Sequence, residues 1–383
     1  MRIVHIVHKP LPDPDADAES IINTAAALGA RGHDVALYVP RPPSASPQPL
    51  DTIANYYGVR PTFRVVELPM ARDAHSFLLS CRHARASLAR ASRNRPHAVF
   101  TTRLEIAWYG LHKRVPTVYD HYRPWGDQFP IMRPALRRYM THPLFLAALL
   151  HSSYAKSAFE RIGIPGTRLV LALNGFDADR LGPPMEKHLA RTHLGLPVET
   201  PLVVYTGRIN SRKGLDTVLQ MAPHLPYVDF LLVGAQGDHP IVRAAAAIPN
   251  VRIVGWRAFD EIGPCLYAAD VLIIPPSSAP LRKYGTTVLP MKTFLYLAAG
   301  RPILAPDEPD TKDLLIDGST ALLVPPDDIG AAVRSLRALL TDPHLSQRIA
   351  AGALQRSSGL TWDHRAEVIE AHLERAVARF ARA

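Results

Sequence analysis

Cysteine is nearly absent from this chain of 383 residues, which has only two, Cys81 and Cys265, far apart in the sequence. Two such residues exclude a disulfide framework and a cysteine-rich zinc site. Scarce cysteine also suits a reducing compartment. We therefore expect a cytoplasmic protein.

Long hydrophobic runs are missing as well. The longest uninterrupted apolar run is Leu144 to Leu150, far below the roughly 20 residues that a membrane-spanning helix needs. The opening MRIVHIVHKPLPD has too short an apolar stretch for a signal peptide, and a buried strand explains it. We expect a protein that is soluble or peripheral on the inner face of the plasma membrane.

Acidic residues are too few to balance the basic ones, and the imbalance is local. Residues 1–180 hold 23 Lys and Arg against 14 Asp and Glu, a formal charge of +9, while residues 181–383 hold 21 against 20, a charge of +1. The basic half favours an anionic partner, although a GC-rich genome that prefers Arg over Lys would leave the same excess. No nucleic-acid recognition motif accompanies the charge, so we expect no nucleic-acid partner.

Length and pattern predict two domains, because about 100–200 residues make one domain. Apolar strands alternate with helices from 3–7 onward, and the alternation restarts at 202–206 after a Pro-rich polar stretch. Continuous apolar strands suit a parallel sheet that is covered on both faces. The fold class is therefore α/β, with two doubly wound, Rossmann-like domains facing a cleft in which ligands bind.

The expected boundaries are 1–180, 181–360 and a C-terminal helix over 361–383. Within the first domain we expect residues 134–150 to be helical or broken helical.

Two segments of the second half carry the chemistry. Gly207 follows a strand, and Arg208 and Lys213 stand in the loop that opens a helix. Glycine admits a close ligand, and two cations at a helix start form a seat for a diphosphate. The second segment begins a helix near Pro290, with free backbone N–H groups at Met291 and Lys292.

These stretches resemble the retaining GT-B glycosyltransferases, especially glycosyltransferase family 4. Gly207-Arg208 with Lys213-Gly214 resembles the donor-diphosphate motif, and LPMKTFLYLAAGRPILA resembles the signature helix in its P-x-K variant. LNGFD at 173–177 resembles the N-G-x-D turn, and GLTWDHRAEVIEAHLE resembles the helix that crosses back to the first domain. Together the motifs cover most of the chain in the family's order.

The resemblance implies a metal-independent transferase without a cofactor. It would move a sugar, with retention, from a nucleotide-diphosphate donor to a polysaccharide, lipid-linked or small-molecule acceptor. The implied donor-binding residues are Gly207, Arg208, Lys213, Gly234, Thr287, Met291, Lys292 and Leu295.

Both glutamate positions of the family's E-x7-E pattern depart from it, because Thr287 stands at the first and Leu295 at the second. Leucine cannot accept a hydrogen bond from a ribose hydroxyl, and an unmet polar contact costs about 1–3 kcal/mol. Three explanations of this departure are open: another residue holds the ribose, donor binding is altered, or the protein is a degenerate homologue. The alternatives to a transferase are therefore a non-catalytic GT-B-like partner or scaffold protein and a nucleotide-sugar epimerase.

In the first half, His121 follows a short strand. In similar enzymes a histidine of this loop faces the sugar, so His121 is the candidate catalytic residue. The loop 12–17 lacks the family's glycine pair and carries three aspartates, which contact acceptor hydroxyls or, as we prefer, charge the start of the next helix.

Basic and apolar residues also lie together in this half. Arginines crowd the predicted helix over 74–94, and Arg133, Arg137 and Arg138 precede the apolar residues 143–146. Such stretches are typical of an interfacial helix on anionic lipid, and equally of a solvated helix face.

Overall fold

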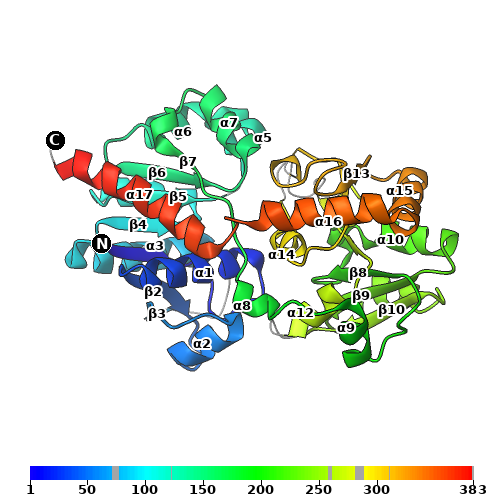
Figure 1. Cartoon of the computed structure of the whole chain (residues 1–383). Coiled ribbons are helices and arrows are strands. Elements are labelled where there is room, and N and C mark those ends of the chain that lie inside the picture. The colour runs from blue at the N-terminus through cyan, green and yellow to red at the C-terminus, as the bar shows by residue number, and fades with distance from the viewer. Residues whose placement is uncertain (71–76, 122, 258–260, 281–288, 310, 382–383) are drawn as a thin grey trace. The chain divides into compact units, whose positions relative to one another are not determined.

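The computed structural model describes residues 1–70, 77–121, 123–257, 261–280, 289–309 and 311–381. It divides into two compact units (Figure 1). Unit 1 comprises Met1–Gly175 and Trp362–Ala383, and unit 2 comprises Phe176–Thr361. None of the helices among the described residues is long and apolar enough to cross a membrane.

Unit 1 is built on a seven-stranded sheet in the order β3-β2-β1-β4-β5-β6-β7, and every pairing is parallel. Its strands are β1 (Arg2–Ile6), β2 (Asp34–Arg41), β3 (Arg64–Pro69), β4 (Ala98–Thr101), β5 (Thr117–Asp120), β6 (Phe145–Leu150) and β7 (Leu169–Leu171). Its helices are α1 (Ala16–Ala30), α2 (Leu50–Tyr57), α3 (Phe77–Asn94), α4 (Leu104–His112), α5 (Trp125–Gln128), α6 (Arg133–Met140), α7 (Ser153–Arg161) and α17 (Trp362–Ala381), with the short 3-10 turns η1 (Pro130–Met132) and η2 (Gly166–Arg168).

Side chains alternate across this sheet, so that each face has its own core. Ile3 packs with residues of α1, α2 and α17, whereas its neighbour Val4 packs with residues of α3 and α4. This is the alternation that a strand covered on both faces requires.

Unit 2 holds a second parallel sheet of six strands in the order β10-β9-β8-β11-β12-β13. Its strands are β8 (Leu202–Thr206), β9 (Asp229–Ala235), β10 (Val251–Gly255), β11 (Val271–Ile273), β12 (Ile303–Pro306) and β13 (Leu322–Val324). Around them lie α8 (Ala178–Leu181), α9 (Lys187–His193), η3 (Ser211–Lys213), α10 (Leu215–Met221), η4 (Ala222–His224), α11 (Pro240–Ala245), α12 (Ile262–Tyr267), α14 (Lys292–Ala298), η6 (Thr311–Asp313), α15 (Ile329–Thr341) and α16 (Pro343–Ser357).

The α/β class with two doubly wound parallel sheets is thus confirmed. In unit 2 the chain runs from β8 outward to β9 and β10 and then returns to β11 on the other side of β8. The carboxyl end of β8 is therefore the topological switch point, where open parallel sheets bind their ligands.

The expectation of helix across 134–150 was wrong in its second half. Residues 133–140 form α6, but Phe145–Leu150 is the strand β6, with all six residues buried. A short apolar run does not by itself distinguish a buried strand from a buried helix. Here it fills the gap between β5 and β7, where both faces are covered.

The C-terminal helix α17 packs on α1 and β6 of unit 1 (Figure 1). Ala366, Ile369 and Leu373 join the core beside α1. Arg365 is buried as well. Its Nη2 donates to both oxygens of Asp120 at 2.8 Å, and neither side chain is more than 3% exposed.

A buried hydrogen-bond network surrounds that ion pair. The Arg365 Nε donates to Thr24 Oγ1 at 3.0 Å, and His151 Nε2 lies 2.8 Å from an Asp120 oxygen. Burial would raise the pKa of Asp120, but the Arg365 charge and the hydrogen bond from His151 hold it well below its ordinary value. Asp120 is therefore ionised and balanced within the core.

We predict that R365M destabilises the protein by about 3–5 kcal/mol, because it leaves the Asp120 carboxylate buried without its partner. Urea unfolding followed by circular dichroism measures the loss. The matched control is R64M, which removes a more exposed ion pair with Asp34 and should cost no more than about 1 kcal/mol. Equal effects of R365M and R64M would contradict the prediction.

The same ion pair gives a pH dependence. Because the native pKa of Asp120 is depressed, its stabilising contribution is complete above the ordinary aspartate pKa of about 4 and is lost as the pH falls further. The gap in stability between wild type and R365M should therefore narrow on acidification.

Candidate functional site

The loops after β8 and β9 meet backbone to backbone at two glycines. Gly207 has a φ of +126° and donates its N–H to Val233 O at 2.9 Å. Gly234 has a φ of +122°, and a Cβ on it would lie 2.4 Å from the Gly207 oxygen. Both positions therefore require glycine, and the structure brings these two predicted site residues together at the switch point.

Two buried tyrosines hold the backbone of the first loop. The Tyr205 hydroxyl donates to the Arg208 carbonyl at 3.0 Å, and the Tyr296 hydroxyl accepts from the Thr206 N–H at 2.8 Å. Burial raises the pKa of both phenols, so both stay protonated. The sequence analysis missed them, because an aromatic residue within an apolar strand or helix indicates only core.

The cations of the predicted diphosphate seat lie in the same region. Lys213 ends η3, and Gly214 turns the chain into α10 with a φ of +68° while packing closely on Ser277. The Lys213 charge acts on Lys292, the first residue of α14. Because α10 and α14 have only seven residues each, side-chain charge contributes more here than aligned helix dipoles.

Two of the three further predicted positions lie at or near α14. Met291 directly precedes the helix, Leu295 is a half-buried residue within it, and Thr287 lies outside the described residues. The sequence analysis assigned only the backbone N–H of Lys292 to the site. In the structure the side chain of Lys292 places its Nζ 3.3 Å from the centroid of the Tyr205 ring.

Comparisons with known proteins match both halves of the chain. Residues 18–180 match the family model described as Glycosyltransferase Family 4, and residues 200–342 match that described as Glycosyl transferases group 1. The chain belongs to the group 1, family 4 glycosyltransferases.

Individual relatives agree with this assignment. The D-inositol 3-phosphate glycosyltransferase of Xylanimonas cellulosilytica is 30% identical over 206 residues, which are 50% of this chain and 48% of that protein. The chain thus spans about half the length of the curated relatives it matches.

Solved structures extend the likeness to the whole fold. Sucrose-phosphate synthase from Thermosynechococcus elongatus superposes with a TM-score of 0.79 at 18% identity, covering 99% of each chain. Anabaena HepE in complex with UDP and glucose gives a TM-score of 0.71 at 16% identity, covering 97% of this chain and 99% of that one. These glycosyltransferases share the GT-B fold of two parallel-sheet α/β domains.

In unit 1 of this family member, His121 follows β5 and its N–H donates to Leu149 O at 3.0 Å. Its ring stacks on Trp125 at 6.0 Å between centroids and meets the Tyr119 ring edge-on at 5.6 Å. Burial, reinforced by the neighbouring His151 and Arg123, lowers the pKa of His121 to about 3. The imidazole is therefore neutral, the form that can both donate to and accept from a hydroxyl group.

The acidic loop after β1 has a partner that the sequence analysis missed. The Lys9 ammonium lies 3.2 Å from Asp13, 2.7 Å from Asp15 and 2.9 Å from Asp17. The three carboxylates approach one another as metal ligands do, within 4.8 Å, and the lysine places a positive charge beside each of them. Asp15 precedes α1 without a side-chain capping bond. Its charge is therefore stabilised by the ion pair with Lys9 as well as by the expected interaction with the start of the helix.

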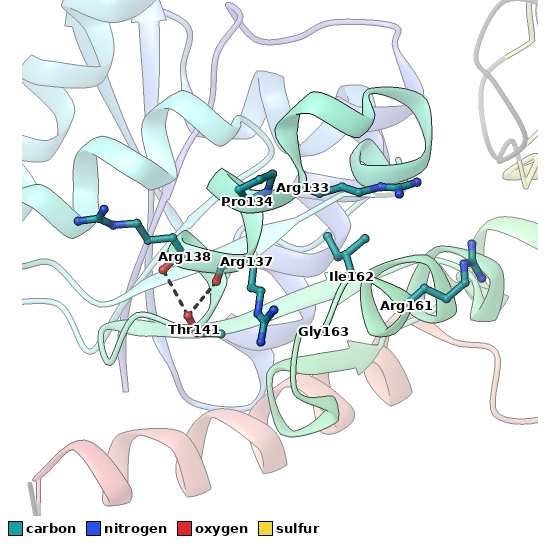
Figure 2. Close-up of a pocket in the computed structure, with 8 residues that line it drawn as sticks. All are labelled: Arg133, Pro134, Arg137, Arg138, Thr141, Arg161, Ile162 and Gly163. Atoms are coloured by element: carbon teal, nitrogen blue, oxygen red, sulfur yellow. Dashed lines mark hydrogen bonds between the residues drawn. The ribbon is translucent and has the colours of Figure 1, made fainter.

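Unit 1 also carries a basic pocket of about 670 Å³ (Figure 2). It is lined by Arg133, Pro134, Arg137, Arg138, Thr141, Arg161, Ile162 and Gly163. Figure 2 shows that the guanidinium groups spread apart, with Arg138 and Arg161 pointing in opposite directions. Asp127 pairs with Arg161 and, at 3.9 Å, with Arg133, and no acidic residue lines the pocket among the described residues.

We predict that G234A destabilises the protein by several kcal/mol, because its new methyl group would overlap the Gly207 oxygen in a conformation that L-residues rarely adopt. Calorimetric melting measures the change. The matched control is G195A, at a φ of +64° with no atom within 4 Å of the new methyl group, for which only the backbone term of about 1 kcal/mol is expected. A G234A melting temperature at or above that of G195A would refute the close packing.

Proposed function

We propose that this chain transfers a sugar from a nucleotide-diphosphate donor to a polysaccharide, lipid-linked or small-molecule acceptor, with retention and without a metal ion or cofactor. The observation that carries the proposal is the set of cations beside the β8 switch point, where a pyrophosphate would find Arg208, Lys213 and closely approachable glycine backbone. Family membership supports it.

The reaction would use these residues as follows. The bond from the sugar's anomeric carbon to the phosphate oxygen breaks, and a bond to the acceptor oxygen forms on the same face. The acceptor's hydroxyl proton passes to the leaving phosphate oxygen, so no carboxylate base is needed. Arg208 and Lys213 stabilise the negative charge that develops on the diphosphate, and neutral His121 contacts a hydroxyl of the transferred sugar.

The first donors to test are UDP-sugars, since HepE was solved in complex with UDP and glucose. We predict that R208A and K213A each lower kcat/KM by roughly 100-fold or more, because each removes a charge from the developing diphosphate. Release of nucleoside diphosphate in the presence of acceptor measures turnover. R212A is the control, since Arg212 is exposed in the same loop and should be nearly neutral.

Full activity in both R208A and K213A would show that neither side chain stabilises the charge on the diphosphate. The leucine at position 295, where a glutamate is usual, favours one competing function, a scaffold subunit without catalysis. Calorimetry with UDP, GDP and ADP separates the two, because a scaffold shows no specific binding. Product analysis without an acceptor identifies an epimerase.

We also propose that unit 1 attaches to anionic membrane surfaces through the arginine surface, defined as Arg133, Arg137, Arg138 and Arg161. Spread guanidinium groups suit headgroups distributed over a plane better than they suit one small anion (Figure 2). Beside them the apolar side chains of Ile131 and Phe129 are 91% and 48% exposed. Exposed apolar groups next to cations are typical of interfacial binding.

Vesicle sedimentation tests this attachment. Because each basic residue contributes about 1 kcal/mol at an anionic surface, R137E/R138E should bind phosphatidylglycerol vesicles at least roughly 10-fold more weakly than wild type. The control R334E/R337E makes the same charge change at exposed positions of α15 and should bind almost as wild type does. Equal binding by the two variants, or equal binding of wild type to neutral phosphatidylcholine, would disprove the proposal.

A further inference from the structure

Lys292 has a partly buried side-chain amine without a carboxylate partner among the described residues. Its ammonium lies over the Tyr205 ring, 3.3 Å from the centroid. An aromatic face attracts a cation by only about 0.5–2 kcal/mol, much less than water or a carboxylate provides. The side chain therefore lies in a place that stabilises its charge poorly in the free protein.

The surroundings of Lys292 belong to the switch point itself. Its Nζ lies 3.2 Å from the position that a Cβ of Gly207 would occupy. The groups that face it are the phenol of Tyr205 from β8 and the ammonium of Lys213 from η3, and the Tyr296 phenol lies one turn further along α14. Helices α8 and α16 also pack against α14, and the Lys213 charge repels a charge on Lys292.

We propose that the Lys292 side chain is a third ligand of the donor diphosphate and that the protein takes up a proton when the diphosphate binds. This inference rests on the proposed function and deepens it. The sequence assigned only the Lys292 backbone to the site, whereas the geometry places its nitrogen beside the glycine that the diphosphate must approach.

Electrostatics explains the proton uptake. Burial, followed by repulsion from Lys213, holds the pKa of Lys292 well below its ordinary value in the free protein. A diphosphate places negative charge beside both amines and so favours the ammonium form. The proton comes from the solvent buffer and returns to it when the diphosphate leaves. The added charge forms only when there is an anion to balance it.

Titration calorimetry of wild type with UDP, GDP and ADP at pH 8, in Tris and in HEPES, tests the inference. At this pH histidines and nucleotide phosphates carry almost no titratable protons, so the difference between the buffers counts protons taken up by amines. Uptake is expected to approach about one proton per nucleotide bound. K292M should bind the nucleoside diphosphate roughly 10-fold or more weakly and take up no proton. The control R212A should retain both the affinity and the proton uptake of wild type.

The outcomes are distinct. If wild type binds a nucleotide without taking up a proton, or if K292M binds as tightly with the same uptake, the inference is overturned and the proposed function stands. If wild type binds no nucleoside diphosphate, both fall. The proton uptake of wild type is measured without any variant. The inference can therefore be overturned even if K292M folds poorly. K292R, which stays charged, should bind without proton uptake.

Discussion

A charge inside a protein must be balanced, and this constraint shapes both units of the chain. In unit 1 it is met internally, because Arg365 and Asp120 neutralise each other. Further hydrogen bonds join Asp120 to His151, and Arg365 to Thr24 and to the Ala172 carbonyl. The pair fixes α17 to the end of β5, the strand that leads directly into His121. The imidazole thus follows a strand whose end is bound to α17.

In unit 2 we propose that the same constraint is met by the ligand, because the charge on Lys292 forms only when a diphosphate balances it. Lys213 and Lys292 approach the β8 switch point while the described residues give Lys292 no carboxylate. The loop itself is rigid, since two phenols hold its backbone and two glycines interlock. A loop held in this way, with Arg208 and Lys213 on it, is prepared for an anion and needs little reorganisation to accept one. The two units therefore use one physical rule in opposite ways, for anchoring and for recognition.

The sequence predicted the fold because its information is local and periodic. Short apolar strands, intervening helices and the glycines after β8 and β9 were all evident, and the parallel class followed from them. Phe145–Leu150 was misassigned because six apolar residues carry no period, and only their neighbours β5 and β7 decide the outcome.

Contacts between distant residues were beyond sequence reasoning. Nothing near Asp120 in the sequence indicates Arg365, and nothing near Gly207 indicates that the Lys292 amine would lie beside it. The roles of His121, Arg208 and Lys213 remain predictions. The likeness to sucrose-phosphate synthase at 18% identity shows that this fold is compatible with extensive sequence change.

The discontinuity of unit 1 has a consequence for biosynthesis. Unit 2 is one continuous stretch, Phe176–Thr361, but unit 1 needs Trp362–Ala383 as well as the first 175 residues. While the ribosome is still making the middle of the chain, the nascent first sheet has an Asp120 without its guanidinium and an α1 face without α17. Unit 2 can therefore fold from one uninterrupted segment, whereas unit 1 completes its core only after the residues of α17 have been synthesised.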